Sequence, residues 1–287
     1  MKYALMRAEL VTHYPLKLIC NVLAVSRGGY YAWLHRPPAP RQQRQAQLRT
    51  AIGTIHATSR QSYGSPRIHA TLHAQQVPCC VNTVAKLMRG QGLQAYRPRP
   101  YRPQTTDSGH GQPVCANHLA RGFSAPQPNR KWVCDLTYIP TGEGWLYLAA
   151  VLDLYSRKIV GWAAGDQMGT ELCLSALRQA LAQRQPGPGL LHHSDRGIQY
   201  ASAAYQGLLR GLRITGSMSR KGNCYDNAVM ESFWSSLKRE HVARAGFVTR
   251  TAARASIGLW IEGWYNRQRR HSALGYQSPE QFEARGI

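Results

Sequence analysis

The change of pattern at Lys131 constrains the fold of this chain more than any other feature of its sequence. Beyond this residue, apolar residues alternate or run together between turn residues, which predicts β-strands. The predicted strands span residues 132–139, 145–152, 157–164 and 190–193. Leucine and alanine at helical spacing predict helices at 170–184, 201–210 and 227–242. Consecutive strands, a helix, another strand and further helices are typical of an α/β fold in which helices flank a mixed sheet.

Two pairs of short helices are predicted before this sheet. In the first pair, apolar residues stop near Val25 and resume after Ser26, which is placed to cap the second helix. The second pair spans 65–74 and 81–89, a helix-turn-helix whose second helix would enter a DNA major groove. The side chains expected to contact DNA there are Asn82, Thr83, Lys86 and Arg89. An ordinary helical hairpin with a solvated basic face is the alternative.

Prolines recur among arginines and glycines between Tyr96 and Lys131, which predicts a semi-extended basic tether rather than a packed domain. Small all-α units are therefore expected to precede the α/β core. The predicted segments are a helical N-terminal segment at 1–45, a helix-turn-helix DNA-binding region at 46–106, a linker at 107–128 and a core with a basic C-terminal tail at 129–287.

Basic residues strongly outnumber acidic ones, with 36 Lys and Arg against 14 Asp and Glu and a formal net charge of +22. Such a balance is expected where many phosphates are bound. Residues 1–134 hold 18 of the basic residues and only two acids, so the N-terminal half of the chain is expected to be the main DNA-binding part. Charge alone leaves open a generic cationic surface or a ribosomal-type protein whose charge serves RNA.

Cysteine spacing and the lengths of apolar segments indicate the cellular compartment in which the protein is expected. The seven cysteines form no C-x-x-C pair, and an odd, scattered set argues against a disulfide framework or a zinc knuckle. Reduced thiols in a cytosolic protein are expected. Charged residues interrupt the first apolar residues, and no segment is long enough to span a bilayer, so neither secretion nor membrane insertion is expected.

Three acids are conspicuous in a chain so poor in them. Asp135 lies inside an apolar strand, where an unpaired charge is costly to bury. Asp195 follows the short strand at 190–193, and Glu231 lies in a predicted helix, separated from Asp195 by 35 residues. Carboxylates at strand ends and on a helix are suitable ligands for Mg²⁺ or Mn²⁺.

Nearby polar and aromatic residues are expected to be structural. Asp153 is expected to cap a turn between strands, and Asp226 to cap the helix that carries Glu231. His193 is either a buried histidine or a residue that supports Asp195. Trp234 is expected in the core rather than against a nucleic-acid base.

The acids lie within or beside five characteristic stretches of sequence. These are Trp132–Tyr138, Leu152–Trp162, His193–Tyr200, Ser217–Ala228 with Glu231–Trp234, and Tyr265–His271. Together they resemble the retroviral-integrase-type catalytic core of bacterial insertion-sequence transposases, in particular the product of the second reading frame, OrfB. The resemblance covers most of residues 130–285, and the helix pair within Tyr63–Arg97 resembles the DNA-binding segment that precedes this core.

The resemblance implies a ribonuclease H-like fold in which Asp135, Asp195 and Glu231 converge at one sheet edge. Two divalent ions, Mg²⁺ or Mn²⁺, would activate a water for strand cleavage and then a DNA 3′-hydroxyl for attack on target DNA. Asp135 is expected to bind both ions, Asp195 one and Glu231 the other. The implied enzyme is a DDE-type polynucleotidyl transferase that integrates an insertion sequence. A metal-dependent nuclease of the same fold and a non-catalytic DNA-binding regulator derived from a transposase are the alternatives.

Further DNA contacts are expected outside the helix pair. Lys238 lies seven residues after Glu231, two helical turns along the same face, where it would hold a DNA end, although a solvated lysine is the competing interpretation. The other expected contacts, with a flexible loop and a solvated tail as alternatives, are Arg220, Lys221 and Asn223 in a loop and Arg269 and Arg270 near the C-terminus.

The resemblance also implies partners. Double-stranded DNA is expected both as element ends and as target, and a homo-oligomer is expected because two DNA ends recombine together. The product of an upstream reading frame is a further expected partner, since such proteins usually act as a fusion with an upstream helix-turn-helix and coiled coil. The implied location is the bacterial cytoplasm, at the nucleoid.

Overall fold

The structure is a computed structural model that describes residues 2–96, 112–221 and 223–286. The chain divides into two compact units, Met1–Gly53 and Thr54–Ile287. Within the described ranges, no helix combines the length and the apolar character needed to cross a bilayer.

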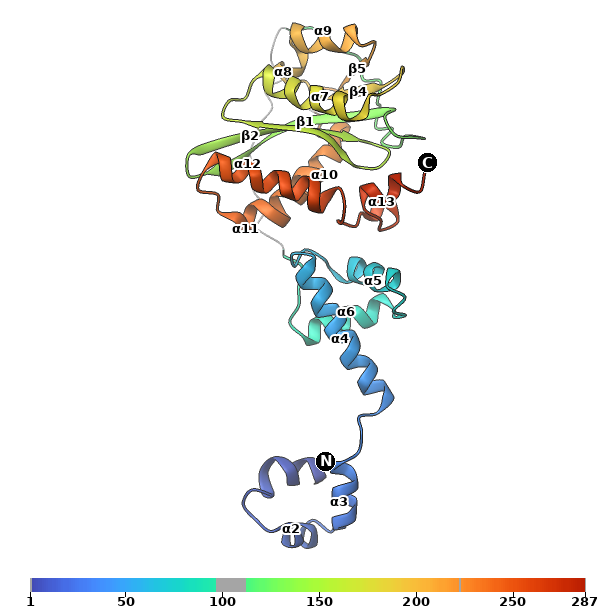
Figure 1. Ribbon diagram of the computed structural model, residues 1–287, viewed down its shortest axis with the longest axis vertical. Helices are drawn as coiled ribbons and strands as arrows, with labels where there is room; N and C mark the ends of the chain where they lie inside the picture. Colours follow the sequence, from blue (N-terminus) through green and yellow to red (C-terminus); the bar gives the residue numbers. More distant parts are fainter. Residues whose placement is uncertain (1, 97–111, 222, 287) are drawn as a thin grey trace. The chain divides into compact units, whose positions relative to one another are not determined.

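The first unit is helical (Figure 1). Its elements are α1 (Lys2–Leu5), the π-helical turn η1 (Met6–Leu10), α2 (Leu16–Val22), α3 (Arg27–Leu34) and the start of α4 (Pro40–Thr58). Ser26 caps α3 as predicted, because the Gly29 N–H donates to its Oγ at 2.9 Å. Met6, Ile19 and Tyr30 are buried together in the small core of this unit. The predicted boundary at residue 45 falls inside α4, a mostly polar helix without the apolar period that would reveal it.

The second unit begins with the predicted helix pair. α5 (Ser65–Ala74) and α6 (Val81–Gly90) are both present. Each helix buries one apolar stripe, with Ile68 and Leu72 on α5 and Val84 and Leu87 on α6. Both predicted helices are therefore confirmed, and the polar side of α6 is left for other contacts.

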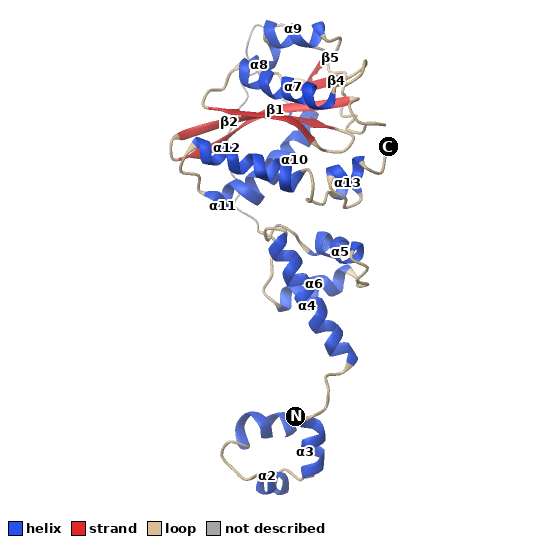
Figure 2. Ribbon diagram, in the orientation of Figure 1, coloured by secondary structure: helices blue, strands red, loops and turns tan. Residues whose placement is uncertain are grey.

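A five-stranded mixed sheet forms the centre of this unit (Figure 2). Its strands are β1 (Lys131–Thr141), β2 (Gly144–Asp153), β3 (Ile159–Gly165), β4 (Leu191–Ser194) and β5 (Thr215–Met218), in the spatial order β3-β2-β1-β4-β5. The first three strands pair antiparallel, and β4 and β5 run parallel to β1. The predicted mixed sheet is confirmed, but β5 was missed because its Thr-Gly-Ser-Met sequence has no apolar alternation.

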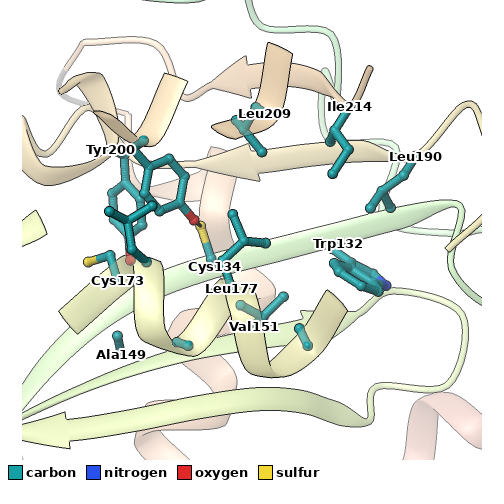
Figure 3. Close-up of a cluster of buried hydrophobic side chains, with 14 of the residues drawn as sticks. Trp132, Cys134, Ala149, Val151, Cys173, Leu177, Leu190, Tyr200, Leu209 and Ile214 are labelled. Atoms are coloured by element: carbon teal, nitrogen blue, oxygen red, sulfur yellow. Dashed lines mark hydrogen bonds between the residues drawn. The ribbon is translucent and has the colours of Figure 1, made fainter. Parts of the chain in front are cut away.

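Helices cover both faces of the sheet, as Figure 1 shows. One face carries α7 (Thr170–Arg184), α8 (Ile198–Ala201) and α9 (Ala203–Gly211). The other carries η2 (Cys224–Asn227), α10 (Ala228–Leu237), η3 (Lys238–Val242), α11 (Ala243–Ala245), α12 (Arg250–Leu259), η4 (Trp260–Tyr265), η5 (Ser272–Leu274) and α13 (Pro279–Glu283). On the α7 face, Trp132, Cys134 and Val151 from the sheet pack with Leu177 of α7 and Leu209 of α9 (Figure 3). Alternation along β1 therefore directs Asp135 to the opposite face, toward α10.

The tether predicted before the core is wrong for the residues that follow position 111. Leu119 is buried, and the Oγ of Ser217 on β5 accepts hydrogen bonds from the backbone N–H groups of His118 and Leu119. Cys115 donates to Gln206 Oε1 on α9 at 3.3 Å. Proline and glycine prevent regular secondary structure here but do not prevent packing. The remaining part of the prediction, at 97–111, lies outside the described residues.

Candidate active site

Asp135 lies in the middle of β1 and is half-buried between the sheet and α10. Its Oδ2 accepts a hydrogen bond from the indole Nε1 of Trp234 at 3.0 Å. Its Oδ1 accepts from the backbone N–H of Leu136 at 2.8 Å. The carboxylate is thereby held by one donor on each oxygen.

Asp195 follows β4, the strand that pairs parallel with β1. The register pairs Val133 with His193, so a continuation by two residues aligns Asp135 with Asp195. The backbone N–H of Gly197 donates to Asp195 Oδ1 at 2.9 Å, which fixes the start of the following turn. Adjacent parallel strands thus bring two acids, 60 positions apart in the sequence, to one edge of the sheet.

Glu231 lies in the first turn of α10, with its side chain exposed. The start of this helix is attached to β1, because the side-chain amide of Asn227 donates to the carbonyl oxygen of Cys134 at 3.2 Å. The residue before Asp135 is therefore tied to the residue that precedes the Glu231 helix.

Electrostatics links the three acids. The pKa of Asp135 is raised to about 8. The largest cause is burial, and the negative charges of Asp195 and, more weakly, of Glu231 add to it. Burial also raises the pKa of Glu231. Lys238 lies with its Nζ 5.1 Å from the centre of the Tyr138 ring, where burial lowers its pKa and the charge of Asp135 raises it. The predicted basic group is thus in the electrostatic field of the acids.

The donor set suits a hard divalent cation, because it consists of carboxylate oxygens whose mutual repulsion a cation would relieve. Among the described residues, no three His, Cys, Asp or Glu side chains are gathered closely enough to hold a single ion together. The charge of Asp135 instead interacts with that of Asp195 and, more weakly, with that of Glu231.

Most of the α6 side chains that the sequence predicts to contact DNA are exposed. Asn82, Lys86 and Arg89 are exposed, whereas Thr83 is half-buried and its Oγ1 lies 3.1 Å from the Sγ of Cys80. A side chain bound to the loop before the helix is less available to a groove. Three of the four predicted contacts therefore lie on one accessible face.

Asp226 does not cap α10, contrary to expectation. Its buried carboxylate accepts hydrogen bonds from Arg220 Nη2 at 2.8 Å, Arg121 Nε at 3.1 Å and Asn117 Nδ2 at 2.9 Å. These donors hold the pKa of Asp226 well below its usual range. Arg220 is therefore paired with Asp226 while its side chain remains exposed, as does that of Lys221.

Asn223 belongs to the same network, since its Oδ1 accepts from Arg121 Nη2 at 3.2 Å. Asp153, by contrast, caps its turn as predicted, with Oδ1 accepting from the Tyr155 N–H at 2.9 Å. The Tyr155 partner of Asp153 is local, although Asp153 Oδ2 also accepts from the Asn129 N–H at 2.7 Å, whereas the side-chain partners of Asp226 include residues more than 100 positions away.

Arg269 requires a correction as a predicted DNA contact. It is 4% exposed, and its guanidinium binds the carboxylate of Glu240 through Nε at 2.8 Å and Nη2 at 2.6 Å, with Ser236 Oγ as a further acceptor. A buried, paired arginine has no face to offer to phosphate. Arg270 is half-buried and donates through Nη1 to the carbonyl oxygen of Tyr276.

His193 is a buried histidine rather than a partner of Asp195. Its Nδ1 lies 2.8 Å from Ser217 Oγ, and its Nε2 lies 3.2 Å from Ser219 Oγ. Burial lowers its pKa to about 4, so the ring is neutral at physiological pH. It joins the end of β4 to the β5 segment.

Trp234 and Asn227 were missed as residues of the site. Trp234 was assigned to the core, which is correct for its ring but omits its N–H donor. The available signal was helical spacing, because Trp234 and Lys238 lie three and seven residues after Glu231 and so share its face.

The fold is that of an integrase-core protein with a helix-turn-helix region. Residues 125–224 and 212–279 match two integrase core domain families, and residues 42–101 match an HTH-like domain family. Across its full length the chain is 43% identical to the transposase InsF for insertion sequence IS3A of Escherichia coli strain K12, and the match covers 100% of both chains. The chain therefore belongs to the IS3 family of insertion-sequence transposases, which confirms the resemblance and the prediction of a transposase with an integrase core.

Other similarities extend the comparison. The insertion element IS600 uncharacterized 31 kDa protein of Shigella sonnei is 43% identical over 92% of this chain and 97% of that protein. The HTLV-2 integrase catalytic core domain in complex with magnesium matches 55% of this chain and 99% of its own, with a TM-score of 0.44 and 15% identity. A simian T-cell lymphotropic virus intasome, in complex with PP2A regulatory subunit B56 gamma, matches 81% of this chain and 74% of its own, with a TM-score of 0.47 and 14% identity.

Proposed function

We propose that this transposase cuts and rejoins DNA at the edge of the sheet where β1 and β4 lie side by side, with Asp135, Asp195 and Glu231 as its catalytic acids. One observation carries the proposal: in a chain of net charge +22, the half-buried Asp135 lies on β1 in the register that aligns it with Asp195 after β4, and burial together with the charges of Asp195 and, more weakly, Glu231 raises its pKa. Such a concentration of negative charge is costly unless a cation or a proton compensates it.

The three acids would hold two divalent ions, Mg²⁺ or Mn²⁺, with Asp135 shared, Asp195 on one ion and Glu231 on the other. The interactions of the Asp135 charge with that of Asp195 and, more weakly, with that of Glu231 support this assignment, because a shared ligand does not require all three acids to meet at a single ion. The exposed Glu231 side chain has free rotatable bonds with which to reach such a position. Bound ions would lower the pKa of a water or a 3′-hydroxyl and stabilise charge on the phosphate.

The protein's own groups would position the DNA. Lys238 presents its ammonium beside Asp135 and over Tyr138, where it would bind a phosphate of the element end. Lys221 follows Arg220, which Asp226 holds, so it would approach the DNA strand from the β5 side. Orientation of the reacting phosphate and hydroxyl supplies much of the rate in such reactions.

The exposed residues of α6 would bind element DNA in the major groove. Asn82 offers a base-edge donor and acceptor, and Lys86 and Arg89 offer cations for phosphate or guanine. We propose that recombination takes place in a homo-oligomer on double-stranded DNA, at the bacterial nucleoid, with an upstream-frame product as an additional partner.

A strand-joining assay tests the proposed catalysis. Labelled element ends and target DNA are incubated with Mg²⁺ and with Asp135→Asn, Asp195→Asn or Glu231→Gln protein. Each substitution is expected to reduce both cleavage and joining by roughly 10³-fold or more, the scale of losing a residue of a catalytic unit. The matched control is Glu171→Gln, which removes an exposed glutamate of α7 whose ion pair is with the exposed Arg178.

Cleavage without joined product in the unaltered protein would identify a nuclease of the same fold instead. Undiminished joining by the Asp135→Asn protein would contradict the proposal, and so would activity that persists in excess chelator.

A further inference from the structure

The indole of Trp234 is positioned against the catalytic carboxylate rather than merely packed in the core. Trp234 is 6% exposed, and its Nε1 donates to Asp135 Oδ2 at 3.0 Å. Its ring packs against Phe233, with the centroids 4.7 Å apart, which restricts its rotation. The indole N–H is therefore held beside Asp135 by a side chain whose rotation is restricted.

Other buried tryptophans show that packing alone does not require such a bond. Trp132, Trp260 and Trp264 each bury Nε1 without a hydrogen-bond partner among the described residues. A buried donor normally finds an acceptor, and that of Trp234 has found a carboxylate. An indole N–H suits this role because it cannot lose its proton at physiological pH and cannot itself bind a metal ion.

The contact is one of three that attach α10 and its continuation to β1. Asn227 donates to the carbonyl oxygen of Cys134, Trp234 donates to Asp135, and Lys238 lies over the ring of Tyr138. Trp234 and Lys238 lie four positions apart and so share one face of the helix and its continuation, and Asn227 lies immediately before the first turn of α10. Glu231 lies on the same helix, three residues before Trp234, so its position relative to Asp135 depends on this attachment.

The geometry also leaves room for ligands. Each carboxylate oxygen has two lone-pair directions, and each oxygen of Asp135 uses one, for Trp234 or for Leu136. One direction on each oxygen remains, which is the requirement for a carboxylate that serves two cations.

We infer that Trp234 is a positioning residue for the metal site: its N–H fixes the orientation of the Asp135 carboxylate and sets the distance between β1 and the Glu231 helix. The inference rests on the proposed function, since it assumes that Asp135 binds the metal ions. Groups that orient a ligand are worth about 10–100-fold in metal affinity or activity.

Replacement of Trp234 by Phe removes the N–H and keeps an aromatic ring. The matched control is Trp132→Phe, which makes the same truncation on the same strand as Asp135, at an indole without a hydrogen-bond partner among the described residues. Mg²⁺ binding to each DNA-free protein is measured by calorimetry, and the Mg²⁺ concentration for half-maximal joining is measured separately.

Trp234→Phe is expected to weaken Mg²⁺ binding about 10-fold or more, with joining partly restored at high Mg²⁺. Trp132→Phe is expected to lose stability but to keep its Mg²⁺ dependence. Equal Mg²⁺ dependence in the two variants would overturn the inference. If Asp135→Ala also leaves Mg²⁺ binding unchanged, the proposed function itself fails. If Asp135→Ala abolishes binding while the two tryptophan variants behave alike, only the role of Trp234 fails.

A second measurement does not depend on the folding of the Trp234 variant. The indole N–H resonance of Trp234 in the otherwise unaltered chain is expected to move on addition of Mg²⁺ and in Asp135→Ala protein, whereas that of Trp132 stays in place. A Trp234 resonance that is insensitive to both changes would contradict the hydrogen bond and the inference with it.

Discussion

Two aspartates of the core illustrate how environment decides the state of a carboxyl group. Asp135 is half-buried between the sheet and α10, and its burial together with the charges of Asp195 and, more weakly, Glu231 raises its pKa to about 8. Asp226 is fully buried, but two arginines donate to it, and its pKa falls. Asp226 is therefore already paired with two arginines, whereas Asp135 is left for the cation that we propose it binds.

The raised pKa of Asp135 predicts that Asp135→Asn stabilises the metal-free protein. In the unfolded chain an Asp titrates at about 4, whereas in the folded protein Asp135 titrates at about 8. The free energy of unfolding that the protonated Asp135 contributes is therefore fully present below about pH 4 and is lost as the pH rises to about 8. Thermal unfolding in chelator is expected to show a higher melting temperature for the variant at about pH 8 and little difference near pH 4. A gain of about 1 kcal/mol corresponds to roughly 2–4 °C in a domain of this size.

Asp226→Asn provides the control of opposite sign, because its lowered pKa means that the ionised group stabilises the fold above pH 4. This variant should melt earlier at neutral pH. Mg²⁺ should stabilise the unaltered protein and not Asp135→Asn. A lower melting temperature for Asp135→Asn at about pH 8 would contradict the raised pKa of Asp135 and, with it, the repulsion between Asp135 and the other two acids.

At the scale of elements, the site depends on how closely helices approach the sheet. α10 is attached to β1 through side-chain contacts, whereas α7 approaches β3 through backbone proximity at Gly161. A Cβ at Gly161 would lie 2.6 Å from the backbone nitrogen of Ala180, so the helix can lie here only against a residue without a side chain. α7 in turn completes the core that backs β1.

Gly161→Ala is therefore expected to destabilise the protein by about 1–3 kcal/mol or more, the cost of overpacking a close contact. Chemical denaturation monitored by circular dichroism measures the change in the free energy of unfolding. Gly207→Ala is the control, because a Cβ there meets nothing within 4 Å and glycine inside a helix costs about 1 kcal/mol relative to alanine. It should leave stability unchanged or raised, and equal losses in both variants would argue against the close approach.

At the scale of the whole molecule, positive charge is concentrated in the part of the sequence that precedes the core, and acids in the core itself. The segment after residue 111 packs against β5 and α9, and its Arg121 pairs with Asp226 of the core. Basic residues that are paired in this way hold the segment to the core, and those that are exposed on α6 are the ones that we propose bind DNA.

Lys86→Ala is expected to weaken binding of element DNA and to reduce the slope of log affinity against log salt by about 1, the effect of losing one phosphate contact. The measurement is a fluorescence-anisotropy titration at several salt concentrations. Arg178→Ala is the control, because this exposed arginine of α7 is paired with Glu171. An unchanged salt slope for Lys86→Ala, or an equal change in both variants, would remove α6 from the DNA interface.

Local patterns in the sequence determined the elements of the core. Apolar alternation predicted β1 and helical spacing predicted α7, because burial of one face imposes a period on the residues that form it. Ser26 and Asp153 were predicted as caps for a similar reason, since the backbone N–H that each of them caps lies within three residues of it. The choice of Asp135, Asp195 and Glu231 rested on the rarity of acids and on their context in the sequence.

Only the tertiary structure decided which polar groups meet. Asp226 binds Arg121 across 105 positions, Arg269 binds Glu240 across 29 positions, and Trp234 binds Asp135 across 99 positions. A charged side chain looks the same in the sequence whether it faces solvent, DNA or a buried partner. Strand pairing and helix packing bring distant residues together, and the free energy of a buried polar group depends on that distant partner rather than on its neighbours in the chain.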